Sequence, residues 1–110
     1  MIEISGTTIK MTRGDTLRTF ITLTDSEGEE YIPSPDDHIR FAMKRTYKDP
    51  EPLILKEIPY NTLELVLNPE DTKSLDAPST YVYDIEITFG NGDVDTFINK
   101  AKLSLTEEVY

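Results

Sequence analysis

One stretch decides the fold class of this chain: Tyr81-Val82-Tyr83-Asp84-Ile85-Glu86-Ile87-Thr88-Phe89. Aromatic or branched apolar residues occupy every second position, and mostly polar residues stand between them. Because successive residues of a β-strand point to opposite faces, this pattern predicts a strand with one buried and one wet face. The turn-forming run Gly90-Asn91-Gly92-Asp93 follows, and a second strand-like run begins at Val94. The stretch therefore predicts a β-hairpin within an all-β domain.

Strand-like alternation recurs along the rest of the chain, separated by turn signals. The further predicted strands are Thr7–Thr12, Leu17–Thr24, Ile39–Lys44, Leu53–Ile58 and Leu63–Leu67. The one helix signal is Asn68-Pro69-Glu70-Asp71, where Asn can cap the first turn and Pro suits its first position. The sequence predicts an all-β, immunoglobulin-like antiparallel β-sandwich of about seven strands with one short helical turn. Residues 1–110 are expected to form a single domain.

The face assignments predict which side chains pack between the two sheets. The expected core residues are Ile21, Leu23, Phe41, Leu65, Tyr83, Ile85, Ile87 and Leu103. The last hairpin allows two registers. A two-residue Asn91-Gly92 turn pairs Ile85 with Ile98, whereas a three-residue loop with a bulge places Phe97 opposite Ile85. The second register buries more apolar area, and we expect it.

Composition narrows the functional classes. The chain has 110 residues, a formal net charge of −10 and no cysteine, so it can form neither a disulfide framework nor a thiolate metal site. Nucleic-acid binding is not expected, because such proteins carry a basic patch and the lysines and arginines here are scattered. Neither a signal peptide nor an apolar run of membrane-spanning length is found, so no membrane association is expected.

The candidate catalytic and ligand-binding groups are weak. His38, the single histidine, follows Asp36 and Asp37, a pattern that is more typical of a solvated loop end than of a cation site. Paired carboxylates such as Asp84 and Glu86 arise by chance on an acidic surface. Arg13-Gly14-Asp15 reads as a turn rather than as an adhesion motif. The sequence therefore predicts a non-enzymatic protein without metal or other cofactors.

Two proline-bearing loops, 31–37 and 45–52, are the predicted docking surfaces. Prolines lower the entropy that a loop loses on binding, and an exposed tyrosine is a common interface anchor. The candidate partner-binding residues are Tyr31, Pro33 and Pro35 in the first loop and Tyr47, Pro50 and Pro52 in the second. Phe20 falls on the wrong face of its strand, so it either meets a partner or covers the edge of the core.

Three segments occur in a characteristic order along the chain. They are Thr12-Arg13-Gly14-Asp15-Thr16, Leu67-Asn68-Pro69-Glu70-Asp71-Thr72 and Tyr81-Val82-Tyr83-Asp84-Ile85-Glu86. Their order and spacing resemble the N-terminal domain of the baseplate upper protein family of phages of Gram-positive bacteria. The chain differs in having Ser79 and Thr80 before the tyrosine strand, where many relatives have glycine.

The resemblance implies a virion structural or assembly role and no catalytic residues. A tail or baseplate accessory protein of this kind docks on other virion proteins, often in several copies, and is assembled in the cytoplasm of the host bacterium. A head decoration protein built on the same domain is one alternative. A module that binds carbohydrate or a cell-surface ligand is another, and exposed coplanar aromatic rings on one sheet face would favour it.

Overall fold

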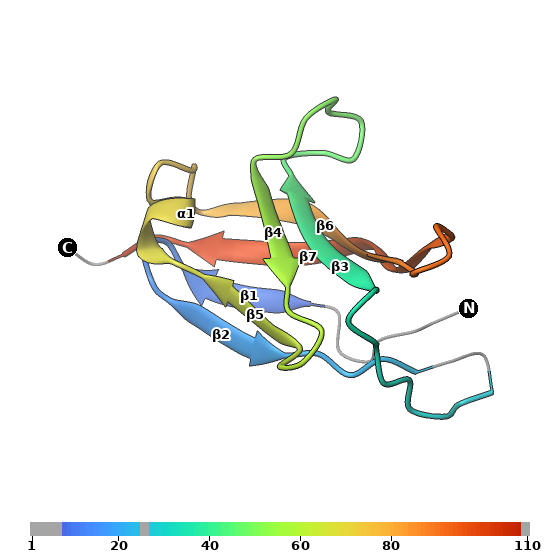
Figure 1. Ribbon diagram of the computed structural model, residues 1–110. Helices are drawn as coiled ribbons and strands as arrows, with labels where there is room; N and C mark the ends of the chain where they lie inside the picture. Colours follow the sequence, from blue (N-terminus) through green and yellow to red (C-terminus); the bar gives the residue numbers. More distant parts are fainter. Residues whose placement is uncertain (1–7, 25–26, 109–110) are drawn as a thin grey trace.

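The part of the chain that the structure describes forms seven strands and one short helix (Figure 1). The structure is a computed structural model that describes residues 8–24 and 27–108. In chain order the elements are β1 (Ile9–Thr12), β2 (Leu17–Phe20), β3 (His38–Lys44), β4 (Ile54–Ile58), β5 (Glu64–Leu67), α1 (Pro69–Lys73), β6 (Ser79–Thr88) and β7 (Val94–Thr106). The predicted all-β, sandwich-like fold with one short helix is confirmed.

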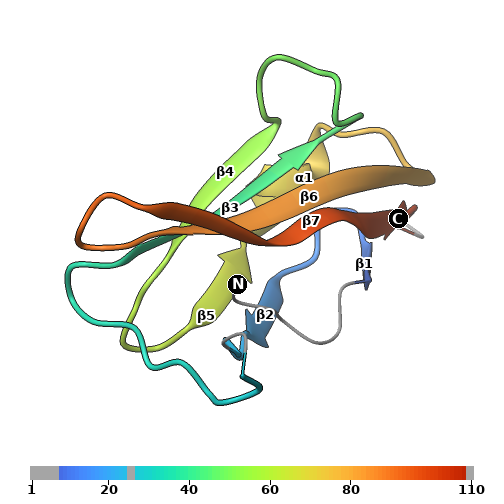
Figure 2. The same ribbon diagram turned by 90° about the vertical axis from the view of Figure 1, so that its right-hand side faces the viewer.

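The strands form two layers, which Figure 2 shows from the side. The larger sheet has the order β1-β7-β6-β3-β4, and the smaller sheet pairs β2 with β5. The run β7-β6-β3-β4 corresponds to the G-F-C-C′ order of variable-type immunoglobulin domains. One pairing departs from the predicted antiparallel arrangement, because β1 runs parallel to β7, with Ile9 opposite Leu103. After β1 the chain turns a corner and enters the other sheet as β2. The strand β1 therefore pairs with β7, which is distant in the sequence, and not with the strand that follows it.

The core lies between the two sheets, and every predicted core residue is buried in it. The β6 side chains Tyr81, Tyr83, Ile85 and Ile87 point inward, as the alternation predicted. The predicted strand at Leu17–Thr24 is shorter than expected and ends at Phe20. Ile21 and Leu23 remain buried beyond its end. Phe20 is 71% exposed, so it does not cover the core edge.

The β6–β7 hairpin begins in one of the two registers that the sequence allowed and, from Tyr83 on, follows neither of them. Next to the turn the register is that of a three-residue loop, with Thr88 opposite Val94, as predicted. Irregularities then shift the pairing, so that Ile85 lies opposite Ile98 rather than Phe97. The prediction for Phe97 was therefore wrong. The extra residue of a bulge moves every later partner by one position, and the sequence did not fix where the bulge falls.

The hydrogen bonds around α1 explain how the chain crosses from β5 to β6. The helix begins after Asn68, whose backbone N–H donates to Asp71 Oδ2 at 2.7 Å, as in a capping box. At the start of β6 the hydroxyl of Tyr81 donates to the backbone oxygen of Asp76 at 2.7 Å. This contact has the form of the tyrosine corner of immunoglobulin-like domains. It holds the end of the crossing against the core.

The Arg13-Gly14-Asp15 segment is a structural corner. Arg13 Nη2 and Nε donate to Glu108 Oε1 at 2.6 and 2.9 Å, and its Nη1 donates to the Leu75 carbonyl at 3.0 Å. Gly14 has a φ of 83°, and its N–H donates to Thr72 Oγ1 at 2.8 Å. The corner thus joins β1, α1 and the end of β7, which favours the turn interpretation over the adhesion motif.

Candidate docking surfaces

The six predicted partner-binding residues do not form one surface. Loop 31–37 leads into β3, and loop 45–52 leaves its other end. A strand of this length spans about 20 Å, so the two loops lie at opposite ends of the sheet (Figure 1). Each loop must therefore be considered with the residues that actually surround it.

Loop 45–52 projects from the sheet and presents Tyr47, which is 57% exposed. The loop is held in shape by its own polar groups. Asp49 accepts hydrogen bonds from the N–H and hydroxyl of Thr46 at 3.2 and 3.3 Å, and Lys44 Nζ donates to the Asp49 carbonyl at 2.8 Å. Pro50 and Pro52 are exposed.

Tyr47 borders a small pocket on the outer face of the larger sheet. The pocket has a volume of about 40 Å³ and is lined by Ala42, Lys44, Tyr47, Val82, Tyr83 and Asp84. Leu55 lies opposite Ala42 in the β3–β4 register and is 58% exposed. Leu53 is also exposed, and its N–H donates to the Met43 carbonyl. We refer to Tyr47, Leu53 and Leu55 as the apolar strip.

Arg45 fixes the base of this loop. Its guanidinium lies 3.0 Å from the Asp76 carboxylate and 5.7 Å from the centre of the Tyr81 ring. The half-exposed charged group therefore connects the loop to the tyrosine corner. Loop 45–52 is consequently connected to the core at its first residue.

Loop 31–37 uses most of its predicted partner-binding groups inside the fold. Tyr31 is half-buried, and its ring meets Phe89 edge-on with 5.8 Å between the centroids. Pro33 is buried, whereas Pro35 is exposed. The large apolar side chain that this loop presents to solvent is Ile32, at 71% exposure. No role was predicted for Ile32, because a single isoleucine in a loop has no distinguishing pattern.

Asp37 is the polar centre of this end of the molecule, and sequence reasoning missed it. Its carboxylate accepts hydrogen bonds from the Tyr31 hydroxyl at 2.6 Å, the Ser34 N–H at 3.0 Å and the Gly90 N–H at 3.2 Å. Burial favours the neutral acid, but these donors outweigh it and lower the pKa of Asp37. Burial, with the hydrogen bond to Asp37, raises the pKa of Tyr31 to about 12.

The predicted neighbours of His38 do not converge on it. Asp37 turns inward, and His38 Nδ1 lies 3.2 Å from Glu57 Oε1 on the adjacent strand, at an exposed position. Across residues 8–24 and 27–108, no group of three or more histidine and acidic side chains is arranged to hold a metal ion. The arrangement around His38 is that of an exposed cross-strand pair.

No protein-family profile matches the chain, and no curated protein sequence matches it. None of the helices in the described part of the chain is long and apolar enough to cross a membrane.

Proposed function

We propose that this domain is a structural or assembly module of a phage or prophage virion, which docks on neighbouring tail or baseplate proteins through the apolar strip. The observation that carries the proposal is the exposure of Tyr47, which lines a pocket, together with the exposure of Leu53 and of Leu55, which is paired with the pocket residue Ala42. Adjacent exposed apolar side chains are typical of interaction sites. The virion partner class comes from the resemblance of the three segments to phage baseplate domains.

The geometry of loop 45–52 supports docking in two ways. Tyrosine combines a large apolar surface with a hydroxyl, and it is common among the residues that dominate binding energy. The loop is also ordered before binding, by the Thr46–Asp49 turn and by Arg45. A preordered loop loses less conformational entropy when a partner binds.

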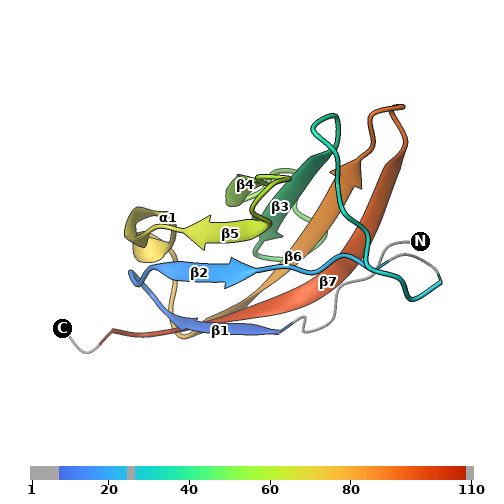
Figure 3. The ribbon, with the colours of Figure 1, turned by 60° about the horizontal axis from the view of Figure 1, so that its bottom comes forward.

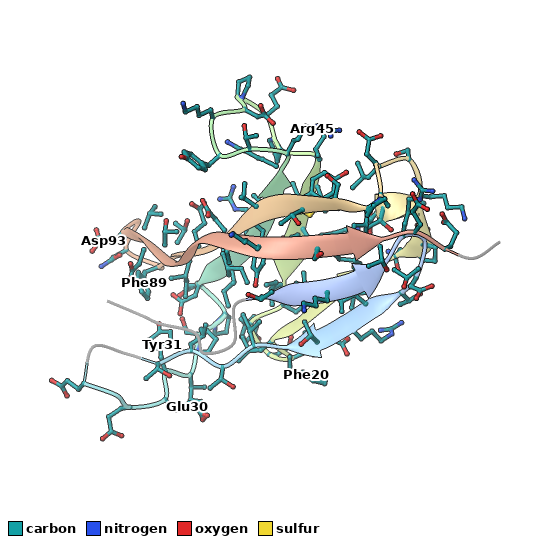
Figure 4. The ribbon with its side chains drawn as sticks, turned by 180° about the vertical axis from the view of Figure 1, so that it is seen from behind. Phe20, Glu30, Tyr31, Arg45, Phe89 and Asp93 are labelled. Carbon is teal, nitrogen blue, oxygen red and sulfur yellow. The ribbon has the colours of Figure 1, made fainter. Side chains whose placement is uncertain are left out.

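The carbohydrate-binding alternative gains less from the structure. Phe20 belongs to the two-stranded sheet, whereas Tyr47 follows a strand of the five-stranded sheet. Figure 4 shows Phe20 and the base of the Tyr47 loop, at Arg45, on opposite sides of the molecule. These two rings therefore do not build one stacking platform for a sugar.

The test is binding of the purified full chain to tail, baseplate and head proteins of the same virion, each immobilised separately. Tyr47→Ala is expected to weaken binding at least tenfold, which corresponds to about 1.4 kcal/mol. Phe20→Ser is the matched control, because it removes from the other sheet an aromatic ring that is 71% exposed, against 57% for Tyr47. The protein that binds identifies the virion position, with a head protein favouring the decoration role.

Two results would overturn the proposal. One is the failure of every virion protein to bind the wild-type chain. The other is saturable turnover of a substrate by the purified protein. An equal loss of binding in Tyr47→Ala and Phe20→Ser would keep the docking function and reject the apolar strip as its site.

A further inference from the structure

A buried carboxylate joins two loops that are far apart in the sequence. Asp37 is only 6% exposed, and its three hydrogen-bond donors come from both loops. Tyr31 and Ser34 belong to loop 31–37, and Gly90 belongs to the turn 89–93 between β6 and β7. A buried carboxylate is costly unless such donors satisfy it. If either loop moves away from Asp37, the buried carboxylate loses at least one of its hydrogen-bond donors.

The two loops also touch through carbon atoms. The Tyr31 ring packs against Phe89, which begins the turn. A Cβ atom added at Gly90 would lie 2.8 Å from the Asp36 Cβ, so only glycine allows this approach. Figure 3 shows the two loops side by side beyond the ends of β3 and β6, and Figure 4 shows Tyr31 and Phe89 at the same end.

We infer that Asp37 makes loop 31–37 and turn 89–93 one conformational unit, so that a displacement of either loop is transmitted to the other. Asp37 acts in this unit as a positioning residue, since its buried side chain is not available to a partner. Coupling of this kind is reciprocal, so a perturbation applied at either loop must appear at the other. One consequence rests on the proposed docking function, namely that a partner that binds one loop would change the conformation of both.

Amide hydrogen exchange of the free full chain, followed by NMR, tests this coupling without any partner. Gly90→Ala forces the turn away from Asp36 and is expected to speed exchange of the Ser34 amide at least fivefold. Gly92→Ala is the matched control. Gly92 has a φ of 94°, so alanine strains the backbone of the turn there, but an added Cβ would meet nothing within 4 Å. The effect is therefore expected to stay within the turn.

The reciprocal experiment starts from the other loop. Tyr31→Phe removes only the hydroxyl donor to Asp37 and is expected to speed exchange of the Gly90 amide, while amides of the core strands keep their protection. Asp37→Asn should loosen both loops together. The inference is overturned if Gly90→Ala and Gly92→Ala affect Ser34 equally, or if Tyr31→Phe leaves Gly90 unchanged. Because Tyr47 lies at the other end of β3, failure of the docking proposal would leave this result intact.

Discussion

Replacing Ile85 with alanine tests the face assignment from which the fold was predicted. Ile85 is 2% exposed in the middle of β6, where it lies opposite Phe41 of β3. Truncating such an isoleucine removes buried methyl groups and leaves a cavity that a packed sandwich fills only in part, and the usual cost is about 2–5 kcal/mol. We expect Ile85→Ala to lower the free energy of unfolding by this amount.

The same loss can be expressed as a melting temperature. Unfolding entropy near 60 °C is about 2.1 cal/mol/K per residue, so a chain of 110 residues has about 0.23 kcal/mol/K. A loss of 2–5 kcal/mol then lowers the melting temperature by about 9–22 °C. Urea and thermal unfolding, both followed by far-UV circular dichroism, provide the two measurements.

Two control variants test a smaller truncation at the same position and a truncation at an exposed position. Ile85→Val removes one methylene and should cost only about 0.5–1.5 kcal/mol. Leu55→Ala truncates an exposed side chain of β4 and should stay within about 0.5 kcal/mol of wild type. A loss below about 0.5 kcal/mol for Ile85→Ala would mean that the inward and outward faces of β6 are reversed.

Three further predictions concern the polar contacts and turns. Tyr81→Phe should cost about 1 kcal/mol in urea unfolding, because it leaves the Asp76 carbonyl without its donor. The hydrogen bond from Arg13 holds the pKa of Glu108 at about 2, against an ordinary value of 4.5. Glu108 therefore stabilises the fold above about pH 4.5, and this contribution is lost as the pH falls towards 2. Glu108→Gln should flatten this part of the curve of unfolding free energy against pH. Gly14→Ala should lower the melting temperature more than Gly28→Ala does. Both have φ near 83°, but only Gly14 is closely surrounded.

Local pattern was sufficient to predict the strands and the core. The alternation in β6 depends only on the geometry of an extended chain, so Tyr83 and Ile85 could be placed on the buried face without knowing their neighbours. Pairing was harder, because it depends on contacts between segments. Neither the parallel meeting of β1 with β7 nor the bulge beside Ile98 leaves a mark in any single stretch of sequence.

The candidate site was predicted less well than the core, for the same reason. Tyr47 stands out from its loop composition, and the structure does expose it. Tyr31 has a similar sequence context, yet its hydroxyl donates a hydrogen bond to Asp37 and its ring packs against Phe89. What separates the two tyrosines is the approach of turn 89–93 to loop 31–37. That approach is a tertiary contact and has no signature near Tyr31.

The acidity of the chain also has a structural meaning that net charge conceals. A net charge of −10 indicates solubility, but two of the carboxylates collect hydrogen bonds from distant segments. Asp37 reaches Gly90 across 53 positions, and Glu108 reaches Arg13 across 95. Both lie where chain segments converge at an end of the sandwich, where sheet hydrogen bonds no longer hold the backbone. A carboxylate suits these places because its two oxygens accept several donors at once.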